Sequence, residues 1–472
     1  MRRITLPLLS LLQLPFAVGG AQTPAWAQQT DQYVKGEVAR QHIPGLTVAV
    51  LRGDSVVLAR GYGYANLEHH VPATDSTVYE VGSVSKQFTA AAVVMLSEQG
   101  GLRLDDAIAQ FLPEGATVWK GVTIRHLLTH TSGIPDYPDT ALDYHRDYSE
   151  DDLVRLAARQ PPDFSPGETW SYSSTGYVLL GVIIHRVAGV FYGDFLRDHI
   201  FHPLAMRTAR VNSELDIVPN RAAGYELVAG VLRNQDWVSP SLNTTADAGL
   251  SFTVRDLAQW AIALNHGTVP SRAGLEASWT PVRLNDGRTY PYGFGWHVTQ
   301  LRGYRRIGHS GSWRGFQSTM QRFPDFGLTV IVLTNVDQSG PEAISFGIAG
   351  IMEPALTPPH LLSTPLSGAP PRKAIDQLLG DLAAGRDSGE VTPGLKTFMS
   401  DAWRERLGRR VKSVRAWTSL GCDDVAGQHV VRLGARIEQI CYAKGSRPVA
   451  SALFTILYDA DWRAAGIDLY FF

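Results

Sequence analysis

The pattern of apolar and polar positions predicts β-strands at both ends of the first 350 residues. Near the N-terminus, runs 46–51 and 56–61 are separated by Arg-Gly-Asp-Ser, which is typical of a hairpin. The segment from about 84 to 265 has mainly helical or loop patterns. Strand patterns return at 292–298, 304–310, 315–323 and 328–333. This order predicts an α+β unit whose cleft lies where a helical insert meets an antiparallel sheet.

One predicted helix carries a lysine in its first turn. Positions 87–96 are apolar on nearly every face, which predicts a buried helix that ends near Gly100. The helix dipole and burial both disfavour an ammonium ion at Lys86, so we expect this lysine to accept a proton. Ser83 lies three residues earlier, on the same face. The pair predicts a nucleophilic hydroxyl with its activating base.

Lysine is scarce in this chain, which gives Lys86 more weight. Of the 43 basic residues 36 are arginine, and a guanidinium cannot act as a base. The Ser-x-x-Lys spacing is weak alone, because random placement gives about half a match in this chain. The alternative is a surface lysine at a frayed helix start.

Tyr172 precedes a second apolar helix that ends at Gly189. The positive end of this helix favours a phenolate, so Tyr172 could exchange protons with Lys86. The alternative is a tyrosine that only packs.

A third segment, His309-Ser310-Gly311-Ser312, ends one predicted strand and leads into the next. Glycine in an edge strand lets a substrate backbone approach, and the amides of Ser312 and Ser83 could hold a developing oxyanion. We expect His309 to add partial positive charge near Tyr172. The alternative is an exposed, idle histidine in a β-hairpin.

The order of these motifs resembles the serine β-lactamase-related family, which includes class C β-lactamases, D-alanyl-D-alanine carboxypeptidases, D-aminopeptidases and esterases. The resemblance spans about residues 33–352. The motifs that carry it are Val-Gly-Ser-Val-Ser-Lys at 81–86, Thr-Ile-Arg-His-Leu-Leu-Thr-His-Thr-Ser-Gly at 123–133, Tyr-Ser-Ser at 172–174 and Gly-His-Ser-Gly at 308–311.

The resemblance implies a β-lactamase/transpeptidase-like antiparallel sheet flanked by helices. It also implies that Ser83 is the acylated nucleophile, with Lys86 and Tyr172 as general bases. His309 stands where many members carry the lysine of Lys-Thr-Gly, so a carboxylate-binding charge there would depend on pH. Ser174 replaces the usual asparagine and reaches a substrate amide less well. We therefore expect a serine hydrolase for esters, D-amino-acid amides or β-lactams. The alternative is a slowly acylating or non-catalytic sensor of cell-wall fragments or penicillin.

The chain is predicted to contain two folded units behind an export signal. Residues 1–27 combine Arg2 and Arg3, a short apolar stretch and Ala-Trp-Ala, which is typical of a cleaved signal peptide, and the alternative is an anchor helix. We expect a hydrolase domain at 28–353, a stiff proline-rich linker at 354–371 and a small α+β domain at 372–472. In that domain we predict helices at 373–384 and 394–407, and strands at 413–420, 435–443, 450–458 and 464–471.

The two cysteines, Cys422 and Cys441, could form a disulfide in an oxidising compartment. If their two strands formed one tight hairpin, however, the sulfur atoms would lie far apart, so the sequence does not decide whether this bond forms. His126 and His130 are four residues apart but lack a His-Glu-x-x-His pattern, so we expect no metal. Gly-His-Ser-Gly-Ser at 308–312 resembles the nucleophile elbow of α/β-hydrolases but lacks its last glycine, so we reject that interpretation.

Composition excludes other partners. The net charge of −2, which becomes −4 without the first 27 residues, and the lack of a basic cluster argue against nucleic acid. No later stretch is long enough to span a membrane. Together with the predicted signal peptide, this leads us to expect a periplasmic or extracellular protein. We expect a small-molecule or short-peptide substrate and no cofactor, and the sequence leaves the oligomeric state open.

Overall fold

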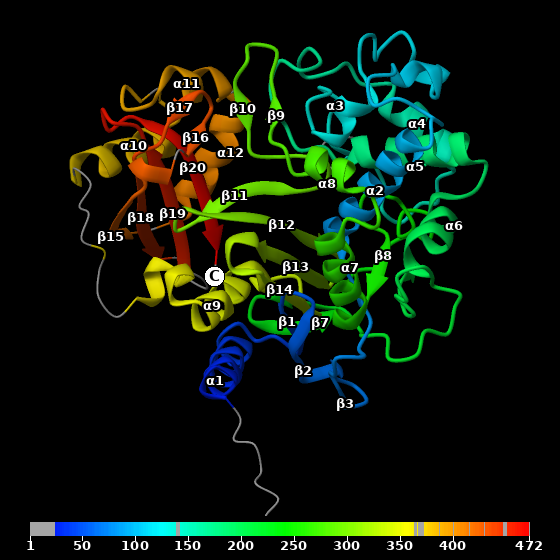
Figure 1. The fold of residues 1–472 in the computed structure, drawn as a ribbon, viewed down its shortest axis with the longest axis horizontal. Helices are drawn as coiled ribbons and strands as arrows, with labels where there is room; N and C mark the ends of the chain where they lie inside the picture. The colour runs from blue at the N-terminus through cyan, green and yellow to red at the C-terminus, as the bar shows by residue number, and fades with distance from the viewer. Residues whose placement is uncertain are drawn as a thin grey trace, which may run out of the picture.

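Two regions make up the described part of the chain (Figure 1). The computed structural model describes residues 24–137, 142–362, 366, 372–386, 388–399, 401–414, 416–428, 430–446 and 451–471. We call residues 24–362 the larger region and residues 372–471 the C-terminal module. Most of the predicted signal peptide, residues 1–23, lies outside the described residues. The domain boundaries themselves stay a prediction.

A seven-stranded antiparallel sheet joins both ends of the larger region, in the order β11-β12-β13-β14-β1-β2-β3. The predicted hairpin is confirmed, because Arg52 pairs with Ser55. The strand expected at 292–298 is wrong in extent: Gly295 adopts a left-handed φ of 76°, which turns the chain before β11 begins. The strands are β1 Gly45–Arg52, β2 Ser55–Asn66, β3 Val71–Pro72, β11 His297–Leu301, β12 Tyr304–Trp313, β13 Phe316–Phe323 and β14 Leu328–Thr334.

Both faces of this sheet are covered. Leu46, Val48 and Val50 of β1 belong to one core cluster, and the alternate Ala49 and Leu51 belong to another, as the two-residue period of a strand requires. The helices α1 Ala25–Arg40 and α9 Pro341–Met352 pack on the first face, and α7 Val254–His266 packs on the second.

The helical insert follows the N-terminal strands. The predicted buried helix is confirmed as α2, and the second predicted helix as α5, which Ser173 caps and Gly189 ends at a φ of 72°. The insert also contains α3 Ile124–Leu128, α4 Glu150–Ala157, α6 Tyr192–Leu196, α8 Arg272–Ser278 and short turns at Ile108–Gln110, Pro113–Gly115 and Arg197–Phe201. Its short strands are β4 Tyr79–Glu80, β5 Arg210–Val211, β6 Tyr225–Val228, β7 Val231–Asn234, β8 Leu250–Phe252, β9 Val282–Arg283 and β10 Thr289–Tyr290.

Among the described residues, no single helix has the length and apolarity to cross a membrane. One pair bent by 75°, Ser174–Ala188 with Tyr192–Phe201, meets both criteria jointly.

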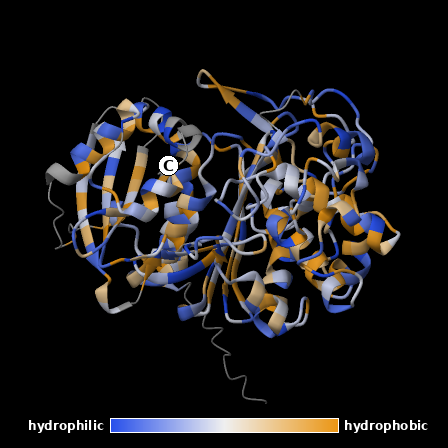
Figure 2. Cartoon of the chain, turned by 90° about the horizontal axis from the view of Figure 1, so that it is seen from above, coloured by the Kyte–Doolittle hydropathy of each residue, from blue (hydrophilic) through white to orange (hydrophobic). Residues whose placement is uncertain are grey.

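The C-terminal module is a four-stranded antiparallel sheet, β15-β18-β19-β20, with three helices. Hydropathy alternates along its strands (Figure 2). The helix expected at 394–407 is two helices rather than one. The elements are α10 Arg372–Ala384, α11 Pro393–Phe398, α12 Asp401–Lys412, β15 Ala416–Asp424, β16 Val431–Arg432, β17 Ala435–Arg436, β18 Gln439–Ser446, β19 Ser451–Tyr458 and β20 Ala464–Phe471.

Cys422 and Cys441 form a disulfide in this module. They lie directly opposite each other on β15 and β18, with Cα atoms 4.0 Å apart. The long connection between these strands, which includes β16 and β17, removes the tight-hairpin objection.

The segment after α9 differs from the extended linker that its prolines suggest. It forms two short turns, Pro354–Leu356 and Pro359–Leu361, because Leu356 is fully buried in the core of the larger region. Residues 363–365 and 367–371 of the predicted linker lie outside the described residues.

Candidate active site

Ser83 and Lys86 meet where the short turn η1 Gly82–Ser85 runs into α2 Lys86–Glu98. The Lys86 Nζ lies 3.1 Å from the Ser83 Oγ, within hydrogen-bond distance. Lys86 is fully buried, whereas Ser83 is partly exposed. The second hydroxyl of this segment is excluded as a nucleophile, because Ser85 is buried and accepts the Leu250 N–H at 3.2 Å. The predicted pair is therefore brought together with its hydroxyl facing outward.

Two further acceptors fix the amine of Lys86. It donates to the backbone oxygen of Asp247 at 2.9 Å and to the Ser174 Oγ at 3.3 Å. Ser174, which we expected beside a substrate amide, is buried and directed toward Lys86. The structure therefore places Ser174 at the base rather than at the open side of the cleft.

An acidic network lies behind Lys86, and sequence reasoning missed it. Asp136 accepts the Ser174 N–H at 2.8 Å, and Tyr137 donates to the Asp247 carboxylate at 2.8 Å. Burial raises the pKa of Asp136, and the neighbouring Lys86 counteracts part of that rise. The contact of Tyr137 with Asp247 joins residues 110 positions apart, and that of Lys86 with Asp247 joins residues 161 positions apart. The one sequence signal was Asp136 following Ser132-Gly133 in a loop.

Tyr172 lies beside the lysine, just before the N-terminus of α5 Ser174–Ala188. The Lys86 Nζ is 5.0 Å from the centre of its ring. Tyr172 is half-buried, and no described residue forms a hydrogen bond with its hydroxyl. The phenol is therefore available to a ligand or water in the cleft.

His130 holds the segment that carries Tyr172. Its Nδ1 accepts the Ser173 N–H at 3.1 Å, and its backbone oxygen accepts the Ser171 N–H at 3.0 Å. Its ring packs on Tyr172 with centroids 4.3 Å apart. Since Nδ1 accepts, the neutral ring carries its proton on Nε2. His130 therefore fixes the position of Tyr172.

His126 stabilises the N-terminus of helix α3. Its Nδ1 accepts the Thr123 N–H at 3.1 Å in the capping box that begins α3. His126 and His130 therefore each accept a hydrogen bond from a different backbone amide, that of Thr123 and that of Ser173. Among the described residues, no group of three or more His, Cys, Asp or Glu side chains is arranged to hold a metal ion.

The predicted oxyanion donors lie where β12 passes over η1. β11 pairs with β12 only as far as Gly308, so the strand beyond it has a free edge. Trp313 and Phe316 flank a two-residue turn and bond to each other. The alternation of antiparallel bonds then directs the Ser312 N–H to the free edge, on the side of Ser83.

Two glycines allow this close approach. A Cβ on Gly311 would lie 1.9 Å from the Val81 oxygen and 2.9 Å from the Ser83 nitrogen. A Cβ on Gly82, which has a φ of 51°, would lie 2.8 Å from the Ser312 nitrogen. The amides of Ser83 and Ser312 can therefore face one space, as an oxyanion hole requires.

His309 differs from its expected role as a positive group. It is buried, and its Nδ1 lies 2.6 Å from the Ser310 backbone oxygen, which can only accept. Its Nε2 lies 3.0 Å from the hydroxyl of Tyr292. Burial, together with the nearby Lys86, lowers the pKa of His309 to about 3. The expectation of a positive charge at His309 is thus wrong, because this imidazole is neutral at physiological pH.

The neighbouring serines differ in exposure. The Ser310 hydroxyl is within 3.0 Å of the Thr319 hydroxyl, whereas Ser312 is exposed and accepts from the Gln317 amide at 2.8 Å. The site combines a partly exposed hydroxyl, a buried amine, a free phenol and two backbone donors. This set can perform acyl transfer through a covalent intermediate.

Comparison with known proteins agrees with this chemistry. The model of the Beta-lactamase family matches residues 30–345. Penicillin-binding protein 4* of Bacillus subtilis is 34% identical over 309 residues, which cover 62% of this chain and 68% of the relative. A D-aminopeptidase of Gluconobacter oxydans is 30% identical over 320 residues, which cover 66% of this chain and 59% of the relative.

A solved structure shows the same fold. The D-stereospecific amidohydrolase from Streptomyces sp. matches with a TM-score of 0.59 and 26% identity, over 69% of this chain and 98% of that structure. The predicted α+β, β-lactamase/transpeptidase-like fold is confirmed.

Proposed function

This chain belongs to the beta-lactamase family, and on that premise we propose that it is an exported serine hydrolase that forms an acyl-enzyme on Ser83. The observation that carries the proposal is the 3.1 Å contact between the partly exposed Ser83 Oγ and the fully buried Lys86 Nζ. The family and its D-aminopeptidase and amidohydrolase members support hydrolysis.

In acylation, Lys86 accepts the proton of the Ser83 hydroxyl as the Oγ attacks the substrate carbonyl carbon. The carbonyl oxygen becomes an oxyanion, which the N–H groups of Ser83 and Ser312 stabilise. The proton passes through Tyr172 to the leaving group as the bond between carbonyl carbon and leaving group breaks. The product is an ester of Ser83.

In deacylation, water attacks this ester on the same carbonyl carbon. Tyr172 and Lys86 accept the water proton and return a proton to the Ser83 Oγ as it leaves. The acid product departs and the free hydroxyl is restored. His309 and Tyr292 support β12 beneath these steps as a neutral, hydrogen-bonded pair.

For substrate we propose an ester or a D-amino-acid amide, in preference to a β-lactam. The D-aminopeptidase and the D-stereospecific amidohydrolase among the similar proteins support an acyl substrate of this kind. Ser174 is engaged with Lys86, so it offers a substrate amide little recognition. Neutral His309 gives no cation for the carboxylate of a β-lactam.

The test compares turnover of a p-nitrophenyl ester, a cephalosporin and a D-alanyl-D-alanine peptide by the full chain. We expect the ester to be hydrolysed faster than the cephalosporin and the peptide, because both of these carry a carboxylate that neutral His309 does not match. Ser83→Ala should be inactive toward all three. If Ser83→Ala equals the wild type, the proposed nucleophile is wrong. If the wild type binds these compounds without turnover, the protein is a sensor rather than a hydrolase.

Export is part of the proposal and is supported by the N-terminal pattern and by a disulfide, which oxidising compartments favour. Cleavage after Ala27 would remove the first three residues of α1, Ala25–Arg40. Expression of the full chain in a bacterial host should yield a periplasmic or secreted product whose mass is that of a chain beginning near Gln28. A product that retains Met1 in the cytoplasm would contradict export.

A further inference from the structure

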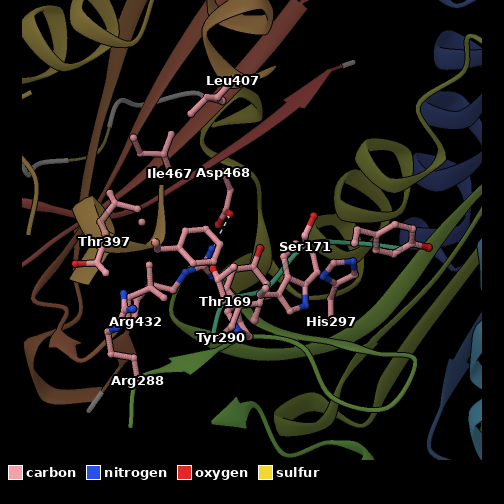
Figure 3. A pocket seen from close by; sticks show the side chains of 18 of the residues that line it. Thr169, Ser171, Arg288, Tyr290, His297, Thr397, Leu407, Arg432, Ile467 and Asp468 are labelled. Carbon is pink, nitrogen blue, oxygen red and sulfur yellow. Dashed lines mark hydrogen bonds and ion pairs between the residues drawn. The ribbon is translucent and has the colours of Figure 1, made fainter. Parts of the chain in front are cut away.

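A large cavity begins beside Tyr172 and extends between the larger region and the C-terminal module. Its volume is about 1140 Å³, slightly above the usual range for pockets that hold drug-sized ligands. Tyr172 and Ser310 lie on its wall, next to Lys86 and the edge of β12. Figure 3 shows Ser171 and His297 of the larger region facing Leu407 and Ile467 of the module across it.

The module supplies an apolar part of this wall. Its contributing side chains come from α11, α12 and β20 and from the turn between β16 and β17, so they are far from Ser83 in sequence. They are Leu395, Phe398, Leu407, Leu433, Ile467 and Leu469.

The charged groups on the wall are largely matched with one another. Arg432 pairs with Asp468 at 3.1 Å, and Arg306 pairs with Glu342 at 2.6 Å. Arg288 donates to Asp286 at 2.6 Å. Three of the four guanidinium groups that line the cavity thus have a carboxylate partner within the protein, and the fourth, that of Arg410, is exposed, so the cavity does not require a charged ligand.

Stacked rings fix the module against the cleft. Trp170, two residues before Tyr172, stacks on Tyr290 with centroids 4.0 Å apart, and Tyr290 stacks on Phe398 of α11 at 5.0 Å. Arg302 also binds Asp423 of the module through two hydrogen bonds of 2.5 and 2.8 Å. The wall is therefore held in place rather than loosely apposed.

We propose that the C-terminal module completes the substrate site by binding an uncharged, apolar or aromatic leaving group of the ester or amide. The inference rests on the proposed function, because it assigns the cavity beside Tyr172 to the leaving group of that reaction. Tyr172 must contact the leaving-group atom to give it a proton, and the cavity opens beside Tyr172. The part of the substrate that extends past this phenol, which is the leaving group, enters the cavity.

The test uses two esters that form the same acetyl-enzyme, methyl acetate and 4-phenylbutyl acetate. We expect the full chain to prefer the second at least about tenfold in kcat/KM, since the difference lies in apolar contact with the leaving group. Thr397→Trp places a large ring at an exposed position on the cavity wall. It should reduce the preference at least about fivefold.

Thr418→Trp is the matched control. Thr418 is exposed on β15, at the edge of the module's sheet opposite β20, and does not line the cavity. It should retain the wild-type preference. Equal preference in the wild type and Thr397→Trp would overturn the inference.

A binding measurement separates this inference from the proposed function. The single variant Ser83→Ala should bind 4-phenylbutyl acetate at least about fivefold more tightly than the double variant that carries both Ser83→Ala and Thr397→Trp. If this difference in binding is found but the wild type turns over neither ester, the proposed hydrolase function is wrong and the cavity is still supported as a binding site. Turnover of both esters with no dependence on Thr397 in catalysis or binding would reject the cavity alone.

Discussion

The Tyr292 hydroxyl lies 3.0 Å from the Nε2 of the buried His309. His309 contributes no positive charge to the site at physiological pH, because burial keeps its imidazole neutral. Burial, with a smaller contribution from Lys86, lowers the pKa of His309 from its ordinary 6.5 to about 3.

Acid sensitivity of folding should follow from this histidine. Between about pH 3 and 6.5 the unfolded chain binds a proton at position 309 that the native chain does not. The free energy of unfolding therefore falls as pH drops from 6.5, by about 1.4 kcal/mol per pH unit for this side chain. We predict that His309→Asn weakens this pH dependence between pH 6.5 and 4.5, measured by denaturant unfolding.

The matched control is His69→Asn, which removes an exposed histidine and should leave the pH dependence as in the wild type. An unchanged dependence in His309→Asn would show that folding does not lower the pKa of His309. His130 and His297 have pKa values that burial lowers in the same direction, so part of the acid sensitivity should persist.

Removal of the amine should abolish most turnover. Lys86→Ala should reduce kcat/KM for an ester by about 10²–10⁴-fold, the range for loss of a general base. Lys120→Ala, which removes an exposed lysine, should leave it unchanged. Full activity in Lys86→Ala, with an unchanged circular dichroism spectrum, would refute the role of Lys86.

The close contact between β12 and η1 should be intolerant of a methyl group. Gly311→Ala would place Cβ 1.9 Å from the Val81 oxygen, so the strand must move away from Ser83. We predict a loss of about 10²-fold or more in kcat, as for loss of an oxyanion donor. Gly36→Ala, in a helix with open space around the added methyl, should leave kcat unchanged and raise the melting temperature slightly, because alanine has the higher helix propensity. Wild-type kcat in Gly311→Ala would contradict the placement of the donors.

His130 should act through the position of Tyr172. His130→Ala removes the acceptor of the buried Ser173 N–H, which costs about 1–3 kcal/mol of stability. We predict at least about a tenfold lower kcat with a smaller change in KM. His130→Asn keeps an acceptor and suits the left-handed φ of 58° at this position, so it should recover much of the kcat. Equal losses of kcat in the two variants would indicate a role other than this hydrogen bond.

Sequence patterns captured the elements that local periodicity controls. The hairpin of β1 and β2, the helices α2 and α5 and the strands β12 to β14 follow from alternation, apolar faces and glycine ends. The meeting of Ser83 with Lys86 was also predictable, because three residues on a helical turn share a face.

Contacts between distant segments were beyond this reasoning. The bond from Lys86 to Asp247 joins residues 161 positions apart, and no local pattern marks it. The neutrality of His309 depends on its burial against side chains such as Tyr292 and His297, which the sequence alone did not display. The cavity required the docked module, whose Phe398 meets Tyr290 across 108 positions of chain.

A covalent intermediate at Ser83 is the central step of the proposed reaction. Intact-mass spectrometry of the full chain, quenched during turnover of a p-nitrophenyl ester, should show one added acyl group. Peptide mapping should place it on Ser83, and Ser83→Ala should show none. An unmodified wild type during active turnover, or an adduct that persists in Ser83→Ala, would contradict the account.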